Sequence, residues 1–301
     1  MNYSRLLIYK LEDRLIRSLV KLPKTNRFNS FPYLSSDTYA FLCDICIDSH
    51  DHFEALDQVA ESQIVYVNGS VLSYLEEEFL FRLARRSRSF TGLVIGDSDQ
   101  PPSLSFLRAV QQYCRFVACV NVSDELSGVL ALPLGLESQK YRSAGQLRDF
   151  KKMPKFDSGS RSIGMLIAWN DETNLLKRSL ARSELSKSKS SLELKNRVPA
   201  RYIHWLMRRT LLVPCPPGNG PDSHRFWETL YLGAIPVILE SDRIPAFDFA
   251  PYFSIRDWAE LVELSMPEIR ELYSSKALEV ASFRKNSLAC LAEIPFSKLE
   301  A

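Results

Sequence analysis

The sequence predicts an α/β protein of two lobes, each built on a parallel sheet, with a helical tail at the C-terminal end. Its 301 residues suit two domains of about 100–200 residues each. Segments rich in β-forming residues alternate with segments of helical periodicity, and this alternation occurs twice. A polar, basic stretch separates the two alternations, so we expect an N-terminal lobe over 1–138, a linker over 139–160 and a C-terminal lobe over 161–301.

Composition and charge are those of an ordinary globular protein. Apolar residues make up 46% of the chain and charged residues 25%, which lets each lobe bury its own core. The formal net charge is +2 and gives no sign of a nucleic-acid partner. The cysteines lie in apolar runs, and we expect free thiols in a reducing compartment. Cys43 and Cys46 point to opposite faces of a predicted strand, which argues against the alternative, a zinc site shared with His50 and His52.

The first 20 residues predict a helix. They carry charges throughout and lack the apolar core of a secretory signal, and no run of the chain reaches the roughly 18 apolar residues of a membrane span. We therefore expect a cytoplasmic location. Leucines spaced by four between Leu7 and Leu19 make this helix weakly amphipathic. We expect it to pack on the body of the protein, and a membrane-surface helix is the alternative.

The N-terminal lobe shows the βα alternation of a parallel sheet with helices on both faces. We expect strands over 39–48, 63–69, 91–99 and 115–123, and helices over 51–62, 70–87 and 101–113. The last of these helices begins after two prolines, a common start for a helix.

The C-terminal lobe repeats the alternation after the basic linker. We expect strands over 162–169, 210–216 and 234–239, helices over 171–185, 201–209 and 222–233, and a long loop over 186–200. The tail shows helical patterns over 256–264 and 266–291.

The segment 211–239 is the most informative part of the sequence. It is a strand, a Gly/Pro-rich loop, a helix, a small-residue turn and a second strand. Such a loop places free backbone N–H groups at the start of a helix, where the helix dipole favours a phosphate. Gly218 and Gly220 let the backbone approach a ligand closely, and Asp222 or Ser223 is the expected N-cap.

Arg225 and Glu228 follow on nearly the same face of that helix. A cation in the first turn is unfavourable for the helix itself, so Arg225 is expected to grip a phosphate. A carboxylate one turn later suits hydrogen bonds to ribose hydroxyls. The alternative is a capped surface helix on which Arg225 and Glu228 form a salt bridge.

The same segment resembles the C-terminal signature of the exostosin-like glycosyltransferases (glycosyltransferase family 47). That signature reads Cys-Pro-x-Gly, then Asp-Ser/Thr-x-Arg-x-x-Glu, then Gly-x-Ile-Pro-Val. It is filled in register by Cys215, Pro216, Gly218, Asp222, Ser223, Arg225, Glu228, Gly233, Ile235, Pro236 and Val237. Looser matches lie at 168–180, which brings forward Arg178 as a second cation, and at 132–137. The resemblance covers roughly 130–240, whereas the N-terminal lobe matches only by its β/α order.

The resemblance implies a GT-B arrangement of two Rossmann-like lobes facing across a cleft. The C-terminal lobe would hold a nucleoside-diphosphate sugar and the N-terminal lobe an acceptor. Arg178, Arg225 and the helix start would neutralise the leaving diphosphate, so no metal or other cofactor is expected. The expected donor-binding residues are Arg178, Gly218, Asn219, Gly220, Ser223, His224, Arg225 and Glu228.

The implied reaction inverts the anomeric carbon and needs one general base in the N-terminal lobe. The side chains at the predicted strand ends are the candidates, with Asp97 first, Asp48 and His50 next, and Asp99 also offered. For each the alternative is a turn or helix-cap residue. The resemblance does not choose among them.

The sequence therefore favours a glycosyltransferase that moves a sugar from a nucleoside-diphosphate sugar to a glycan or other hydroxyl acceptor. The basic stretch 177–209 is either a solvated face or an attraction for an anionic donor or a phosphate-bearing acceptor. A lipid-linked saccharide acceptor and a peripheral membrane contact would fit too. An epimerase would need an early G-x-G-x-x-G turn, which is absent. A non-catalytic sugar-binding protein with a degenerate fold is the other alternative.

Overall fold

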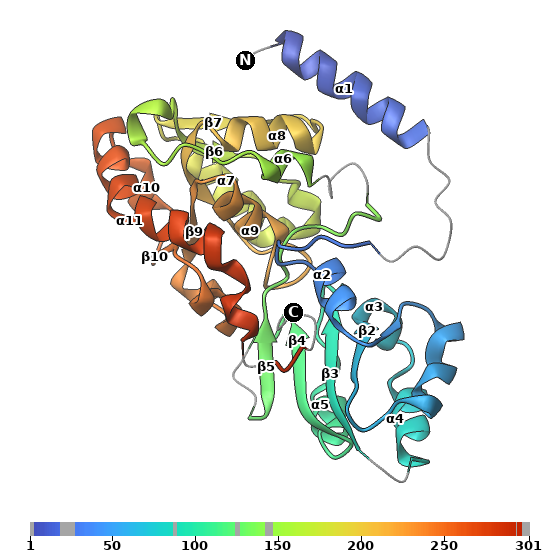
Figure 1. Cartoon of the computed structure of the whole chain (residues 1–301). Helices are drawn as coiled ribbons and strands as arrows, with labels where there is room; N and C mark the ends of the chain where they lie inside the picture. Colours follow the sequence, from blue (N-terminus) through green and yellow to red (C-terminus); the bar gives the residue numbers. More distant parts are fainter. Residues whose placement is uncertain are drawn as a thin grey trace.

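The computed structural model describes residues 3–18, 28–86, 89–123, 127–141, 147–292 and 294–296. Two five-stranded sheets form the two lobes (Figure 1). The N-terminal sheet has the order β1-β2-β3-β4-β5, with strands Ile45–Ile47, Ile64–Asn68, Phe90–Gly96, Cys114–Val120 and Val129–Leu132. The C-terminal sheet has the order β10-β9-β8-β6-β7, with strands Phe253–Ile255, Ile235–Leu239, Thr210–Pro214, Ile163–Ile167 and Ser191–Glu193.

All neighbouring strands in both sheets are parallel. The helices of the N-terminal half are α1 Tyr3–Ser18, α2 Ser36–Leu42, α3 Gly69–Leu72, α4 Glu76–Ala84 and α5 Leu104–Val110. Those of the C-terminal half are α6 Arg148–Lys151, α7 Leu175–Leu185, α8 Ala200–Met207, α9 His224–Tyr231, α10 Ala259–Val262 and α11 Met266–Asn286. The predicted fold class, two parallel α/β lobes in a GT-B arrangement with a C-terminal helical tail, is confirmed.

The direction of chain progression reverses in the C-terminal sheet. Strand β6 lies between β7 and β8, so the chain moves outward on one side of β6 and then returns to its other side. In open parallel sheets, ligands bind at the carboxyl ends of strands beside such a reversal. The loops that follow β6 and β8 are therefore the expected walls of a site.

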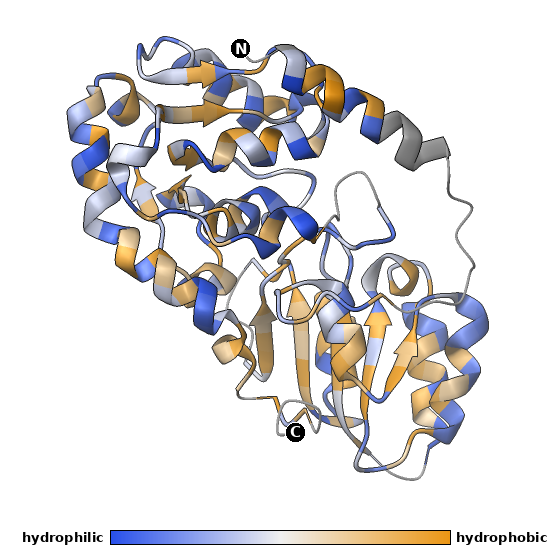
Figure 2. Ribbon diagram, turned by 45° about the horizontal axis from the view of Figure 1, so that its top comes forward, coloured by the Kyte–Doolittle hydropathy of each residue, from blue (hydrophilic) through white to orange (hydrophobic). Residues whose placement is uncertain are grey.

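One hydrophobic cluster joins the lobes. It contains Val94, Ala118 and Leu132 of the N-terminal sheet together with Leu166 and Leu212 of the C-terminal sheet. A second cluster lies within the N-terminal lobe. Figure 2 shows strands that are mostly hydrophobic and helices whose outer faces are largely hydrophilic. The continuous core implies that the lobes support each other.

Several predicted elements differ in the structure. The predicted strand 39–48 is helix α2 followed by the short strand β1, because Ser35 caps a helix by accepting from the Asp37 N–H. Cys43 therefore ends α2 and does not share a strand with Cys46. The expected helix 70–87 is divided into α3 and α4.

Four more differences concern short elements. The expected helix 51–62 is the 3-10 helix His50–Gln58. Strand β7 lies within the expected loop 186–200, and β10 was not predicted. The expected linker contains α6.

The first helix lies against the C-terminal lobe. Its Tyr9 ring lies under the Arg201 guanidinium of α8, and Glu12 forms an ion pair with the same arginine. Leu7, Ile8 and Leu11 face solvent. The prediction that this helix packs on the body is confirmed. The six cysteines are present as thiols, as expected, and all but Cys290 are buried.

Candidate functional site

A cavity of about 420 Å³ lies between the two lobes, where the carboxyl ends of both sheets meet. The N-terminal lobe lines it with Ser70, Asp97, Ser98, Asp99, Leu134, Glu137 and Tyr141. The C-terminal lobe lines it with Trp169, Asn170, Thr173, Arg178, Gly218, Asn219, Asp222, Ser223, His224, Arg225 and Glu228. The loops after β6 and β8, on either side of the chain reversal, thus form the C-terminal wall.

The start of α9 opens toward this cavity. Ser223 is the N-cap, with extended backbone angles, and no side chain caps the helix. The neighbouring Asp222 carboxylate accepts from Trp227 Nε1 at 2.9 Å, from the Leu134 N–H at 2.8 Å and from the Ser223 N–H at 2.6 Å. Burial raises the pKa of Asp222 to about 6. The backbone N–H groups after Ser223 receive no side-chain cap, so they can take another anion.

Arg178 of α7 provides a partly buried positive charge at the cavity. Its Nε donates to the Pro217 carbonyl at 2.9 Å and its Nη1 to the Asn170 carbonyl at 3.0 Å. Burial, and after it the charge of Arg225, lowers the pKa of Arg178 to about 10. Arg178 forms no ion pair with another described residue. Arg178 and Arg225 both line this wall, and their guanidinium groups suit an anion.

Arg225 and Glu228 form the ion pair that the sequence left open as an alternative, at 3.5 Å between Nη1 and Oε2, and both line the cavity. The Arg225 Nε is buried and has no hydrogen-bond partner. Glu228 also accepts from His204 Nε2 at 3.3 Å. Although burial alone would raise the pKa of Glu228, Arg225 and His204 lower it to about 2. Glu228 is thus a permanent carboxylate acceptor at neutral pH.

His204 of α8 holds the Glu228 carboxylate in place. Its second nitrogen, Nδ1, lies 3.0 Å from Asp149 Oδ2 of α6. Burial lowers the pKa of His204, but the carboxylates of Glu228 and Asp149 outweigh burial and the net direction is upward. The buried chain Asp149–His204–Glu228 therefore orients the acid at the cavity.

The loop between β8 and α9 contacts both the cavity and the opposite lobe. Gly218 faces Arg178. Asn219 Nδ2 donates to Asp99 Oδ2 at 3.0 Å across the cleft. A methyl group at Gly220 would overlap the Asp99 carbonyl and meet Asn121 Oδ1 at 2.8 Å. Gly218 and Asn219 thus line the cavity, whereas Gly220 allows the lobes to pack closely.

His224 meets a carboxyl group from the other lobe. Its Nδ1 lies 2.8 Å from the Gly135 carbonyl, and its Nε2 lies 3.4 Å from Glu137 Oε1. Burial raises the pKa of Glu137, and His224 partly opposes that rise. Burial lowers the pKa of His224, but Glu137 and the Gly135 carbonyl raise it overall. The two groups form a coupled pair at the cavity wall.

The candidate bases lie in different places. Asp99 lines the cavity, and its Oδ2 accepts from Asn219 Nδ2. Asp97 follows β3, has a φ of 56° and lines the cavity. Its carboxylate accepts from Asn68 Nδ2 at 2.8 Å and is ion-paired with Lys140. Asp48 and His50 follow the edge strand β1 and do not line the cavity. His50 Nε2 lies instead 2.9 Å from Glu78 Oε2 of α4.

Sequence reasoning did not assign a role to several cavity residues. These are Ser70, Ser98, Tyr141, Trp169, Asn170, Thr173 and Glu137. Glu137 ends the segment 132–137, and Trp169 ends the predicted strand 162–169. A position at or just after the end of a strand was therefore the sequence signal that could have pointed to them. Their partners lie far away in sequence, and only the folded chain brings them together.

A second cavity, of about 920 Å³, adjoins the first in the C-terminal lobe. It shares Trp169, Asn170, Thr173 and Arg225 with the inter-lobe cavity and is completed by residues 193–198 after β7. The two cavities together offer a site long enough for a phosphate group and an attached ring system.

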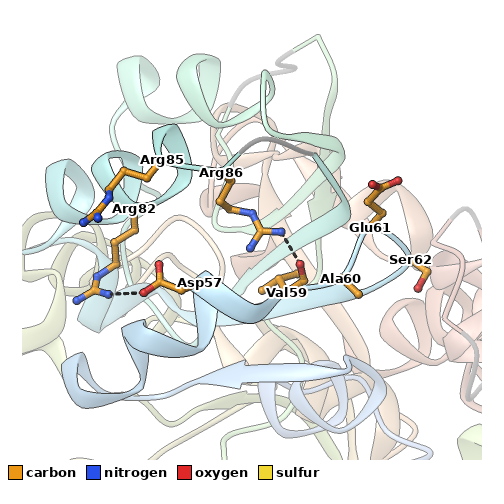
Figure 3. Close-up of a pocket in the computed structure, with 8 residues that line it drawn as sticks. All are labelled: Asp57, Val59, Ala60, Glu61, Ser62, Arg82, Arg85 and Arg86. Carbon is orange, nitrogen blue, oxygen red and sulfur yellow. Dashed lines mark hydrogen bonds and ion pairs between the residues drawn. The ribbon is translucent and has the colours of Figure 1, made fainter.

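A further cavity, of about 710 Å³, lies on the N-terminal lobe away from the cleft (Figure 3). Three arginines line it, but two of them are engaged within the lobe. Arg82 pairs with Asp57 at 3.3 Å, and Arg86 donates to the Leu56 and Val59 carbonyls. These arginines hold the 3-10 helix to α4, so the inter-lobe cavity is the candidate site.

Neither metal clusters nor membrane spans occur in the part of the chain that the structure describes. Its His, Cys, Asp and Glu side chains form no group of three or more that could hold a metal ion. Its helices lack the combination of length and apolar character that crossing a bilayer demands.

No family model matches the chain, and no curated protein matches it. Among solved structures, the chain is similar to alpha,alpha-trehalose 6-phosphate synthase from Burkholderia multivorans. The two are 12% identical with a TM-score of 0.40, and the match covers 81% of this chain and 74% of that chain. The fold of this chain is therefore assigned from its own two sheets.

Proposed function

We propose that this protein is a glycosyltransferase that binds a nucleoside-diphosphate sugar between its lobes and transfers the sugar to a hydroxyl acceptor. One observation carries the proposal: the uncapped start of α9 and the cations Arg178 and Arg225 face the same cavity. Helix N-termini and guanidinium groups together suit the two phosphates of a nucleotide. The resemblance of 215–239 to the exostosin-like glycosyltransferases supports the same conclusion.

In this proposal the diphosphate lies against Ser223 and the backbone around Gly218, between the two guanidinium groups. The ribose lies by Glu228, whose carboxylate is held ready to accept hydrogen bonds from its hydroxyls. The nucleoside extends into the adjoining cavity beyond Trp169. Asn219 and His224 face the sugar.

Transfer forms a bond between the acceptor oxygen and the anomeric carbon and breaks the bond from that carbon to the diphosphate. The departing diphosphate takes the electron pair, and Arg178, Arg225 and the start of α9 stabilise its charge without a divalent ion. A carboxylate of the N-terminal lobe takes the acceptor proton, with Asp97 the sequence candidate that lines the cavity. The half-exposed ring of Tyr141, on the same side, offers an apolar face to a sugar acceptor.

The acceptor is a glycan or a lipid-linked saccharide in this proposal. The alternative, a protein that binds a nucleotide sugar without transferring it, would share the same phosphate site. Release of free nucleotide from a bound nucleotide sugar distinguishes the two, because only the enzyme cleaves the anomeric bond.

The binding site is tested with a panel of UDP-, GDP-, ADP- and CDP-sugars in a thermal-shift assay, followed by calorimetric titration of the matching nucleoside diphosphate. A true donor at about 100 times its Kd stabilises the fold by about 2.7 kcal/mol. Arg178→Ala should weaken that affinity about 10- to 100-fold, because it removes charge-assisted hydrogen bonds. Arg243→Ala, on the same lobe but outside the cavity, is the control and should bind like wild type. Equal affinities in both variants would contradict the site.

A further inference from the structure

The inter-lobe cavity contains three N-terminal carboxyl groups, and they differ in their partners. Asp97 is ion-paired with Lys140 and accepts from Asn68, and Asp99 accepts from Asn219 across the cleft. Glu137 has no such partner: its only ion-pair contact between described residues is with His224, at 3.4 Å. A base must be free to take a proton, so the three carboxyl groups are not equivalent.

The contacts of His224 constrain how it meets Glu137. The Gly135 carbonyl can only accept, so Nδ1 of His224, 2.8 Å away, carries a proton. Nε2 faces Glu137 Oε1 at 3.4 Å, an ion-pair contact when the imidazole is charged. A charged His224 therefore holds the Glu137 carboxylate in place by electrostatic attraction across the lobe boundary.

The location of this pair suits proton transfer at the reacting carbon. Glu137 follows β5 in the N-terminal lobe, where the acceptor is proposed to bind. His224 is the first residue of α9, where the diphosphate is proposed to bind. The anomeric carbon of the donor is joined directly to that diphosphate, so an acceptor hydroxyl that attacks it lies close to both side chains.

We propose that Glu137 is the general base that accepts the proton of the acceptor hydroxyl, and that His224 positions its carboxyl across the lobe boundary. This inference rests on the proposed glycosyltransferase function. As the acceptor oxygen bonds to the anomeric carbon, its proton passes to the Glu137 carboxylate and the diphosphate leaves with the electron pair of the broken bond. The proton is then released to solvent through the open side of the cavity.

Other charged groups at the cavity influence this carboxyl. Asp97 and Glu228 raise the pKa of Glu137, in addition to burial, and His224 lowers it. Lys140 faces Asp97 from the same lobe, and Tyr141 lines the same wall. A base of raised pKa loses its proton at a higher pH than an ordinary glutamate, so the rate should rise with pH along an ascending limb that belongs to Glu137.

The test measures release of nucleotide from the nucleotide sugar selected by thermal shift, with water as the acceptor. Glu137→Gln should lower kcat about 100-fold or more, whereas the Kd of the nucleoside diphosphate stays unchanged. Glu137→Asp should retain part of the rate, and sodium formate should partly restore the rate of Glu137→Ala. His224→Asn should move the ascending limb to higher pH, because it removes the charge that lowers the pKa of Glu137.

Asp97→Asn is the decisive comparison. If Glu137 is the base, Asp97→Asn keeps the ascending limb of the pH profile and Glu137→Gln loses it. The reverse result, or a wild-type rate in Glu137→Gln, overturns the assignment while leaving the proposed function intact. A wild-type protein that binds none of the panel and releases no nucleotide overturns both proposals.

Discussion

Glu228 is held by Arg225 and His204, and this contributes to how the stability of the folded chain depends on pH. Its pKa falls from the ordinary 4.5 to about 2 in the folded chain. A carboxylate whose pKa is lowered by folding stabilises the fold at pH values above its pKa in the unfolded chain. This stabilisation is lost as the pH falls toward its pKa in the folded chain. The shift corresponds to about 3 kcal/mol, fully present above about pH 5 and declining below it.

Glu228→Gln should therefore lower the free energy of unfolding most at pH 6 to 7, and the difference from wild type should shrink between pH 5 and pH 3. Urea denaturation at a series of pH values measures this difference. Glu240→Gln, at a carboxylate whose side chain is 56% exposed, is the matched control and should stay within about 0.5 kcal/mol of wild type. A difference for Glu228→Gln that is constant across this range would contradict the ion-pair account.

The cap of α9 and the contact of Glu137 could not be predicted from the sequence. The sequence offered Asp222 or Ser223 as the cap of helix α9, and it could not choose because both residue types cap helices. In the fold, Asp222 accepts from Trp227 and Leu134 instead. The importance of Glu137 was not visible either, because its contact with His224 joins two lobes.

The loop between β8 and α9 has two glycines with different roles. Gly220 packs against the backbone of Asp99, which cannot move aside without displacing the opposite lobe. Gly218 faces only Arg178 Nη2, the flexible end of a side chain, at 2.9 Å from the position of a methyl group. Substitution by alanine should therefore lower stability at Gly220 and weaken ligand binding at Gly218.

Gly220→Ala should destabilise the fold by about 1–3 kcal/mol, the usual cost of overpacking, whereas Gly218→Ala should cost less. Gly218→Ala should instead weaken nucleoside-diphosphate binding, because it displaces Arg178. Thermal unfolding and calorimetric titration of both variants measure the two effects. Equal loss of stability in the two variants would show that Gly220 does not control the packing of the lobes.

The elements that the sequence predicted best are those with long, clear periodicity. Strands β2, β3, β4, β6, β8 and β9 and helices α5, α7, α8, α9 and α11 all lie within or close to the expected ranges. The errors concern short elements: strands of three residues such as β7 and β10 carry too little pattern to detect. At 39–48, apolar residues with β-forming side chains predicted a strand, but the Ser35 cap and burial on the core favour helix α2.

At the scale of the whole molecule, the shared hydrophobic cluster predicts that both lobes unfold together. All four tryptophans, Trp169, Trp205, Trp227 and Trp258, lie in the C-terminal lobe, whereas the helices of both lobes contribute to the far-UV circular dichroism. Tryptophan fluorescence and circular dichroism should therefore give one coincident transition in urea. Two separate midpoints would mean that the lobes are independent and that the cluster does not couple them.

The arrangement of the lobes also explains why neither lobe forms the site by itself. Parallel strands in both sheets bring their carboxyl ends to a common boundary, and the reversal at β6 opens the C-terminal wall there. The sequence predicted the C-terminal half of this site, where we propose that the phosphates bind, from a local motif. The N-terminal half, where we propose that the acceptor binds, depends on which loops face that motif, and this follows only from the packing of the two lobes.

The central claim is that a nucleoside diphosphate binds at the start of α9 between two guanidinium groups. A crystal structure of the protein with the nucleoside diphosphate selected by the titration tests it most directly. We predict phosphate oxygens within hydrogen-bond distance of the backbone N–H groups after Ser223 and of the side chains of Arg178 and Arg225. Phosphates bound elsewhere, such as among the arginines of the N-terminal lobe in Figure 3, with the start of α9 unoccupied, would contradict the account.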